Sequence, residues 1–228
     1  MVFRHISRFG KKRVRKEAKP LSETEEAQSP ISQAEIVFSL IRNRVDVRRY
    51  LPDDVDAEVL EFLLEAARHA PSSGNHQPWE FVVVRNNDTK KQLVEAAYNQ
   101  EWMLQAPVFI VACVNNRLAG AVYGDRGLKL YGTQNVAAAV ENMVLMARAL
   151  GLGTAWVSAF SEIKASLILQ LPEYVRPQII ITLGYPAEEP KPPVLQSIEE
   201  FTHLEKFGQT IRLKNVIKEK KPYYIKFK

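Results

Sequence analysis

The sequence predicts a domain in which a β-sheet is covered by helices on both faces. Segments with helical periodicity outnumber strand-like segments. The strand-like segments are apolar at consecutive positions, which is typical of strands that are buried on both faces. The chain has 228 residues, of which 46% are hydrophobic and 25% are charged. This size and composition suit one soluble globular domain with a sizeable core.

Apolar residues spaced three and four apart mark the helices. Asp56 suits the N-cap position of the second helix, and Gly151 suits the position that follows the longest helix. The expected helices span about 32–43, 56–69, 89–98, 131–150 and 162–169.

Consecutive apolar residues bounded by turn formers mark the strands. The sequence Gly184-Tyr185-Pro186 ends the domain proper, and the prolines that follow it predict an extended arm. The expected strands span about 80–85, 108–114, 154–157 and 178–183.

The charge is distributed unevenly along the chain. Residues 1–19 hold eight Lys or Arg and one acidic residue, and residues 212–228 hold seven and one. The middle therefore carries a net charge of −8, although the whole chain carries +5. We expect a basic, unstructured N-terminal tail at 1–31, one domain at 32–208 and a basic C-terminal extension at 209–228.

Basic tails of this kind bind nucleic acid or anionic membranes in some proteins and are merely solubilising in others. The tails contain no recognised nucleic-acid-binding motif, so neither nucleic acid nor a membrane is expected as a partner. The single cysteine, Cys113, lies in an apolar run and cannot form an intramolecular disulfide, which favours a reducing compartment. No apolar stretch reaches the roughly 18–20 residues of a membrane-spanning helix, and basic residues interrupt the N-terminus. A cytoplasmic location is expected.

Several common catalytic motifs are absent from the sequence. It contains no G-x-G-x-x-G, no G-x-x-x-x-G-K-[ST] and no G-x-S-x-G. The four histidines are scattered and have no partners at metal-ligand spacing. Metal-dependent and covalent catalysis therefore have weak support.

Three motifs carry chemistry that suits a ligand. Arg44 and Arg48 lie four residues apart, and arginine grips phosphate through a planar fork of donors. The stretch 70–79 is rich in turn formers, and its central loop, residues 71–77, offers the Asn75 amide as both donor and acceptor. The third motif is Trp156-Val157-Ser158-Ala159-Phe160, at the end of an expected strand. Each motif also has a structural reading: arginines paired with surface acids, a helix-to-strand connector, and a strand with one surface serine.

Together the three motifs resemble the nitroreductase family of FMN-dependent oxidoreductases, from about Ile36 to Gly208. The resemblance implies an α+β fold with a mixed central sheet covered by helices on both faces. It also implies an interwoven homodimer in which each C-terminal arm embraces the partner. The implied activity passes hydride from NADH or NADPH through FMN to a small acceptor, such as a nitroaromatic or a quinone, by a ping-pong mechanism.

The resemblance also assigns roles to residues. Arg44 matches the family arginine that holds the FMN phosphate, and Arg48 matches a second arginine of the same region. Ser158 and Ala159 match the positions that place a backbone N–H at flavin N5. The flavin carries the chemistry, and Asp46 and Ser158 are the candidate catalytic residues. The residues expected at the cofactor are Arg44, Val45, Asp46, Arg48, Pro71, Ser72, Ser73, Asn75, Gln77, Ser158, Ala159 and Lys191.

The chain departs from the family pattern near its C-terminal arm. Many relatives carry a further phosphate-binding arginine where this chain has Leu195, and Lys191 is the nearby cation. Either Lys191 substitutes for that arginine, or phosphate affinity rests on Arg44 and Arg48.

Two other functions stay open. Asp46 and Ser158 together resemble the BluB-type flavin destructase branch, which consumes reduced FMN and O2 to make 5,6-dimethylbenzimidazole. The third reading is a non-enzymatic module that binds flavin, or binds nucleic acid through its basic tails. Salt-dependent DNA binding that vanishes on deletion of residues 1–19 would identify the nucleic-acid module.

Overall fold

The computed structural model describes residues 33–189 and 191–211. The expected N-terminal tail and most of the expected C-terminal extension lie outside these residues. The described chain forms two compact units, of which one comprises residues 43–189 and the other comprises 33–42 together with 191–211. The candidate motifs at 44–48, 71–77 and 156–160 all belong to the first unit.

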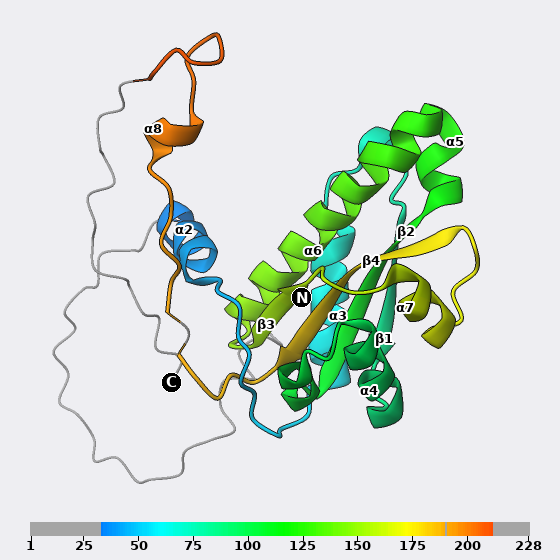
Figure 1. Ribbon diagram of the computed structural model, residues 1–228. Helices are drawn as coiled ribbons and strands as arrows, with labels where there is room; N and C mark the ends of the chain where they lie inside the picture. Colours follow the sequence, from blue (N-terminus) through cyan, green and yellow to red (C-terminus); the bar gives the residue numbers. More distant parts are fainter. Residues whose placement is uncertain (1–32, 190, 212–228) are drawn as a thin grey trace, which may run out of the picture. The chain divides into compact units, whose positions relative to one another are not determined.

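The first unit is built on a four-stranded sheet with the order β1-β2-β4-β3 (Figure 1). Neighbouring strands pair in antiparallel fashion, and the parallel component is an isolated bridge from Asp46 to Thr154 on β3. The register of β2 against β4 shifts between Ala112 and Cys113, where Pro177 lies opposite. A proline cannot donate to the ladder, and a bulge accommodates it inside the sheet. The strands are β1 (Trp79–Val84), β2 (Val108–Asn115), β3 (Gly153–Val157) and β4 (Val175–Gly184).

The expected helices are confirmed, with ends that differ by a few residues. Helix α4 begins earlier than expected because the Asn86 side chain accepts hydrogen bonds from the N–H groups of Asp88 and Thr89. The sequence did not predict α5, which begins at the similar cap Asn115. The helices are α2 (Gln33–Asn43), α3 (Ala57–Arg68), α4 (Asn87–Ala96), α5 (Asn116–Arg126), α6 (Gly132–Ala149), α7 (Glu162–Ile168) and α8 (Ile198–Phe201). Shorter helical turns are η1 (Ser73–Asn75), η2 (Glu101–Gln105) and the π-helical η3 (Gly127–Tyr131).

Helices cover both faces of the sheet, as predicted, and the central strand β2 shows how. Phe109, Val111 and Cys113 point into a core cluster that also contains residues of α4 and α7. Val114 points the other way, toward α6, where a Cβ on Gly132 would lie 2.7 Å from its Cγ2. Residues 108–114 of β2 are therefore buried on both faces. No described helix has the length and apolar content that spanning a membrane requires.

Candidate functional site

The first motif lies beside strand β3. Asp46 forms the parallel bridge with Thr154, and the Val47 N–H donates to the Thr154 carbonyl at 2.9 Å. The approach is close because residue 153 is glycine, and a Cβ there would lie 2.9 Å from the Val47 side chain. The contact brings Asp46 to the strand whose end carries the third motif.

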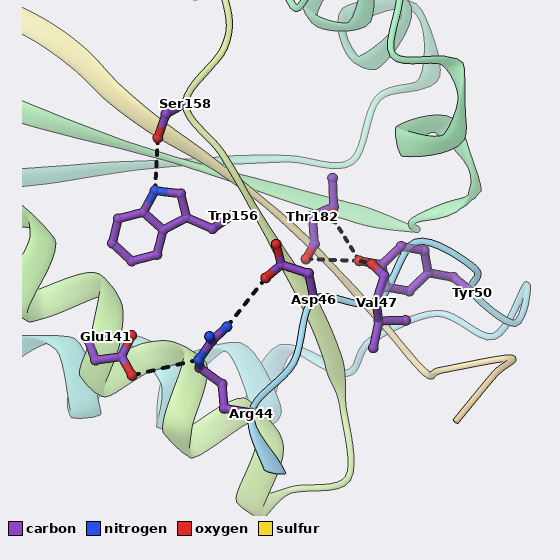
Figure 2. A network of polar contacts seen from close by, with 8 residues as sticks. All are labelled: Arg44, Asp46, Val47, Tyr50, Glu141, Trp156, Ser158 and Thr182. Atoms are coloured by element: carbon purple, nitrogen blue, oxygen red, sulfur yellow. Dashed lines mark hydrogen bonds and ion pairs between the residues drawn. The ribbon is translucent and has the colours of Figure 1, made fainter. Parts of the chain in front are cut away.

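The buried Tyr50 holds the segment that carries the first motif. The Tyr50 hydroxyl donates to the Val47 carbonyl at 2.5 Å, which leaves the Thr182 hydroxyl, 2.7 Å away, as a donor to Tyr50 (Figure 2). Burial raises the pKa of Tyr50, so its hydroxyl keeps its proton and remains a donor. Neither Tyr50 nor Thr182 was identified from the sequence, because their pairing depends on contacts between distant segments.

Arg44 lies between two carboxylates. Its Nη1 is 3.3 Å from Asp46 Oδ1, and its Nε is 3.9 Å from Oε1 of Glu141 on α6 (Figure 2). The side chain is 32% exposed, so a ligand can reach the guanidinium. Glu141 was also missed from the sequence, since one glutamate on a long helix carries no distinguishing signal. Val45, which stands between Arg44 and Asp46 in the chain, is half-buried.

The central loop adopts backbone conformations that are unusual for most residues. Gly74, Asn75 and Gln77 have φ values of 58°, 59° and 49°. This left-handed region suits glycine and tolerates asparagine, whereas glutamine pays a steric cost there. Strained residues of this kind cluster at functional sites when the surrounding structure holds them in place.

The loop is held at its centre by helix α6. Asn135, which is 7% exposed, accepts hydrogen bonds through Oδ1 from the Ser73 N–H at 3.2 Å and from the Ser73 hydroxyl at 3.4 Å. Inside the loop, the Gln77 N–H donates to Ser72 Oγ at 3.1 Å. Gln77 Nε2 donates to the carbonyl and side-chain oxygens of Asn75 at 3.0 and 3.3 Å.

These bonds give the loop residues different roles. Gln77 is committed to the loop itself. Pro71 and Asn75 are exposed, and Ser72 and Ser73 are half-buried. The loop therefore presents the Asn75 amide and the Ser72 and Ser73 hydroxyls near its surface, while Asn135 of α6 holds its backbone at Ser73.

The third motif ends in a turn with exposed backbone donors. The Trp156 indole N–H donates to Ser158 Oγ at 2.9 Å (Figure 2), and the Phe160 N–H donates to the Ser158 carbonyl at 3.2 Å. Ser158 and Ala159 are exposed. Among the hydrogen bonds of residues 33–189 and 191–211, none is donated by the backbone N–H of either residue. The turn thus offers two backbone donors to a ligand.

Helix α6 connects two of the motifs. Asn135 holds the central loop and Glu141 faces Arg44; six residues of α-helix separate them by about 9 Å. Arg48 lies in different surroundings. Its guanidinium carbon is 5.3 Å from the Trp102 ring centroid, and its backbone N–H donates to Glu188 Oε1 at 3.2 Å.

Lys191 and Leu195 belong to the second unit and are exposed, Leu195 to 80%. A role for Lys191 at the cofactor stays a prediction.

Sequence relatives give the site a family context. A protein of Archaeoglobus fulgidus, named provisionally as an NADH dehydrogenase/NAD(P)H nitroreductase, is 33% identical over 156 residues, which cover 67% of this chain and 86% of that protein. The Bacillus subtilis FMN reductase [NAD(P)H] is 33% identical, covering 68% of this chain and 67% of the relative. The 5,6-dimethylbenzimidazole synthase of Rhodospirillum rubrum is 28% identical, covering 70% of this chain and 86% of that protein.

Solved structures have the same fold. NfrA2 of Bacillus megaterium superposes with a TM-score of 0.69 at 27% identity, covering 75% of this chain and 74% of that one. The NADPH:FMN oxidoreductase of Vibrio harveyi gives a TM-score of 0.70 at 21% identity over 76% of this chain and 78% of that one, a likeness of fold alone. A sequence model of the nitroreductase family matches residues 41–100 and 94–185, a range that includes all three motifs. The chain belongs to the nitroreductase family.

Proposed function

We propose that this protein is an FMN-dependent oxidoreductase that uses NADH or NADPH to reduce a small acceptor, such as a nitroaromatic or a quinone. The observation that carries the proposal is the arrangement along β3. Asp46 and its neighbour Arg44 lie at this strand, and the exposed N–H groups of Ser158 and Ala159 follow its end. Bound FMN would supply the hydride transfer between the nucleotide and the acceptor.

The residues present fit FMN by their donor chemistry. The Arg44 guanidinium has five N–H donors, is partly exposed, and contacts its two carboxylates only at 3.3 and 3.9 Å. It can therefore exchange a carboxylate for a phosphate, which binds arginine through charge-assisted hydrogen bonds. The hydroxyls of Ser72 and Ser73 and the amide of Asn75 suit the polar edge of a flavin.

In this proposal the protein binds and orients the flavin and stabilises its reduced form. The N–H groups of Ser158 and Ala159 are fixed donors that stabilise negative charge on a reduced ring, without the cost of reorienting water. Asp46, held by Arg44, accepts hydrogen bonds from ligand hydroxyls. NADH or NADPH and the acceptor use one site in turn, which gives ping-pong kinetics.

A homodimer is part of the proposal. Helix α2 has no buried residue, and four of its large apolar side chains are 43–55% exposed. These are Ile36, Val37, Phe38 and Ile41. An apolar helix face of this kind requires a cover, and a second copy of the chain supplies one by symmetry. Light scattering should give twice the chain mass of 26.0 kDa, and Phe38→Glu with Ile41→Glu should shift the protein toward the monomer.

The decisive test is the visible spectrum of the FMN-reconstituted protein, recorded before and after anaerobic addition of NADH or NADPH. Bleaching of protein-bound flavin by one nucleotide supports the reductase and identifies its donor. A protein that binds no FMN after reconstitution would overturn the proposal.

A second candidate function is the synthesis of 5,6-dimethylbenzimidazole from reduced FMN and O2. The observation that favours it is the placement of Asp46 and Ser158 beside the same strand, with the Ser158 hydroxyl oriented by Trp156. The Rhodospirillum rubrum relative has this name. Reduced FMN with O2 should then yield the benzimidazole, and Asp46→Asn should abolish it. Wild-type protein that forms no product would exclude this function.

A further inference from the structure

Two hydrogen bonds hold the turn that carries the Ala159 N–H. The Phe160 N–H donates to the Ser158 carbonyl at 3.2 Å and closes a tight turn around Ala159. Because the peptide between Ser158 and Ala159 is planar and trans, its N–H points away from that carbonyl. The second bond is made by the Ala159 carbonyl, which accepts from Gln100 Nε2 at 3.2 Å. The peptides on both sides of Ala159 are therefore held.

Gln100 uses both of its amide hydrogens. Its Nε2 donates to the Ala97 carbonyl at 3.1 Å as well as to the Ala159 carbonyl. Since both neighbours are carbonyl oxygens, only the NH2 end of the amide can face them. The side chain is half-buried and joins the end of α4 to the turn that follows β3. A backbone hydrogen bond, from the Ser161 N–H to the Ala96 carbonyl at 2.8 Å, also joins the end of α4 to this turn.

The backbone before Gln100 is strained. Tyr98 and Asn99 have φ values of 57° and 58°, which place two successive non-glycine residues in the left-handed region. Tyr98 is 69% exposed, so burial of its side chain does not explain the strain. This turn brings the Gln100 side chain to the two carbonyls, and the strain is offset by the bonds that it makes possible.

We propose that Gln100 is a positioning residue: it holds the Ala159–Phe160 peptide and with it the turn around Ala159, so that the Ala159 N–H on the preceding peptide stays directed toward the flavin ring. The inference rests on the proposed FMN site. Gln100 touches neither the cofactor nor the substrate in this proposal, and it acts through the turn alone. A fixed donor stabilises the charge on the reduced ring more than a mobile one, because no reorganisation is needed.

The test compares the full-length wild type with Gln100→Ala and Gln100→Glu. The glutamate has the same shape, but it places acceptor oxygens against two carbonyls. Amide hydrogen exchange of Phe160 and Ser161, whose N–H groups donate to the Ser158 and Ala96 carbonyls, should rise about tenfold in both variants, which corresponds to one lost hydrogen bond. In the FMN-reconstituted variants the flavin midpoint potential should become more negative, since the reduced form loses its fixed donor. Gln92→Ala, an exposed glutamine change on α4, is the matched control and should alter neither quantity.

The outcomes separate this inference from the proposed function. Exchange at Phe160 and Ser161 that stays at the wild-type rate would overturn the positioning role, whether or not FMN binds. Faster exchange with an unchanged flavin potential would reduce Gln100 to a structural residue and also overturn it. If the wild type binds no FMN, the proposed function fails, and the exchange data still decide whether Gln100 holds the turn.

Discussion

Arg44 Nη1 lies 3.3 Å from Asp46 Oδ1, and the Nε of the same guanidinium faces Glu141 Oε1 at 3.9 Å (Figure 2). The arginine proposed to bind phosphate is thus held by one carboxylate of its own segment and by another from α6. The three groups carry a net charge of −1, which opposes an anionic ligand. A phosphate must therefore displace a carboxylate from Arg44 to bind well.

Arg44→Ala should weaken FMN binding by about 10- to 100-fold, because a charge-assisted hydrogen bond contributes about 1.5–3 kcal/mol. Titration of the apoprotein with FMN, followed by flavin fluorescence, measures the change. Arg49→Ala is the matched control, since Arg49 is exposed and stands in the same segment. Equal losses in the two variants would show that Arg44 has no specific role.

Glu141→Gln should strengthen FMN binding about threefold. The substitution raises the net charge of the Arg44 group from −1 to zero, and the carboxylate is 46% exposed, so the effect stays within the range of a surface pair, about 0–1 kcal/mol. Isothermal titration with FMN at low ionic strength measures it, with the exposed Glu61→Gln as control. Weaker binding would contradict this expectation and make Glu141 the residue that orients Arg44.

Asn135→Ala should lower stability by about 1–2 kcal/mol and also weaken FMN binding, because the Ser73 N–H loses its acceptor and the central loop loses its anchor. Urea unfolding and FMN titration measure the two effects. Asn142 is the control on the same helix, where its Nδ2 donates to the Ala66 carbonyl at 3.2 Å. Asn142→Ala should lower stability and leave FMN affinity unchanged, and the prediction fails if the two variants bind FMN equally well.

Cys113 should make stability depend on pH in alkaline solution. Burial raises the pKa of its thiol from 9.0 to about 12. The unfolded chain therefore loses this proton at lower pH than the folded protein does, so stability is full below about pH 9 and falls as the pH rises toward 12. Between pH 8 and pH 10 the wild type should lose about 1 kcal/mol more than Cys113→Ala in urea unfolding. If the unfolding free energies of the two proteins change equally with pH, this prediction is wrong.

The sequence predicted the helices around the sheet well and missed α5. Helix α5 has one buried residue, Ala119, and contains Gly120 and Gly124. It therefore lacks the apolar stripe that identifies a helix. Its start depends on the Asn115 side chain, which accepts from the N–H groups of Arg117 and Leu118 at 3.1 and 3.3 Å. A single cap of this kind is too weak a signal in a sequence without further periodicity.

By itself, the sequence determined the strands and the amphipathic helices, because burial requires apolar residues at fixed spacing and these are visible along the chain. It also predicted three candidate ligand motifs, from residue types whose chemistry suits phosphate and flavin. Only the tertiary structure decided that Asp46 lies at Thr154, that Glu141 faces Arg44 and that Gln100 reaches Ala159. These partners are 108, 97 and 59 residues apart in the chain, and single polar residues at such separations leave no periodic pattern. Their pairing follows from the packing of the sheet and helices, which brings distant segments together after local structure has formed.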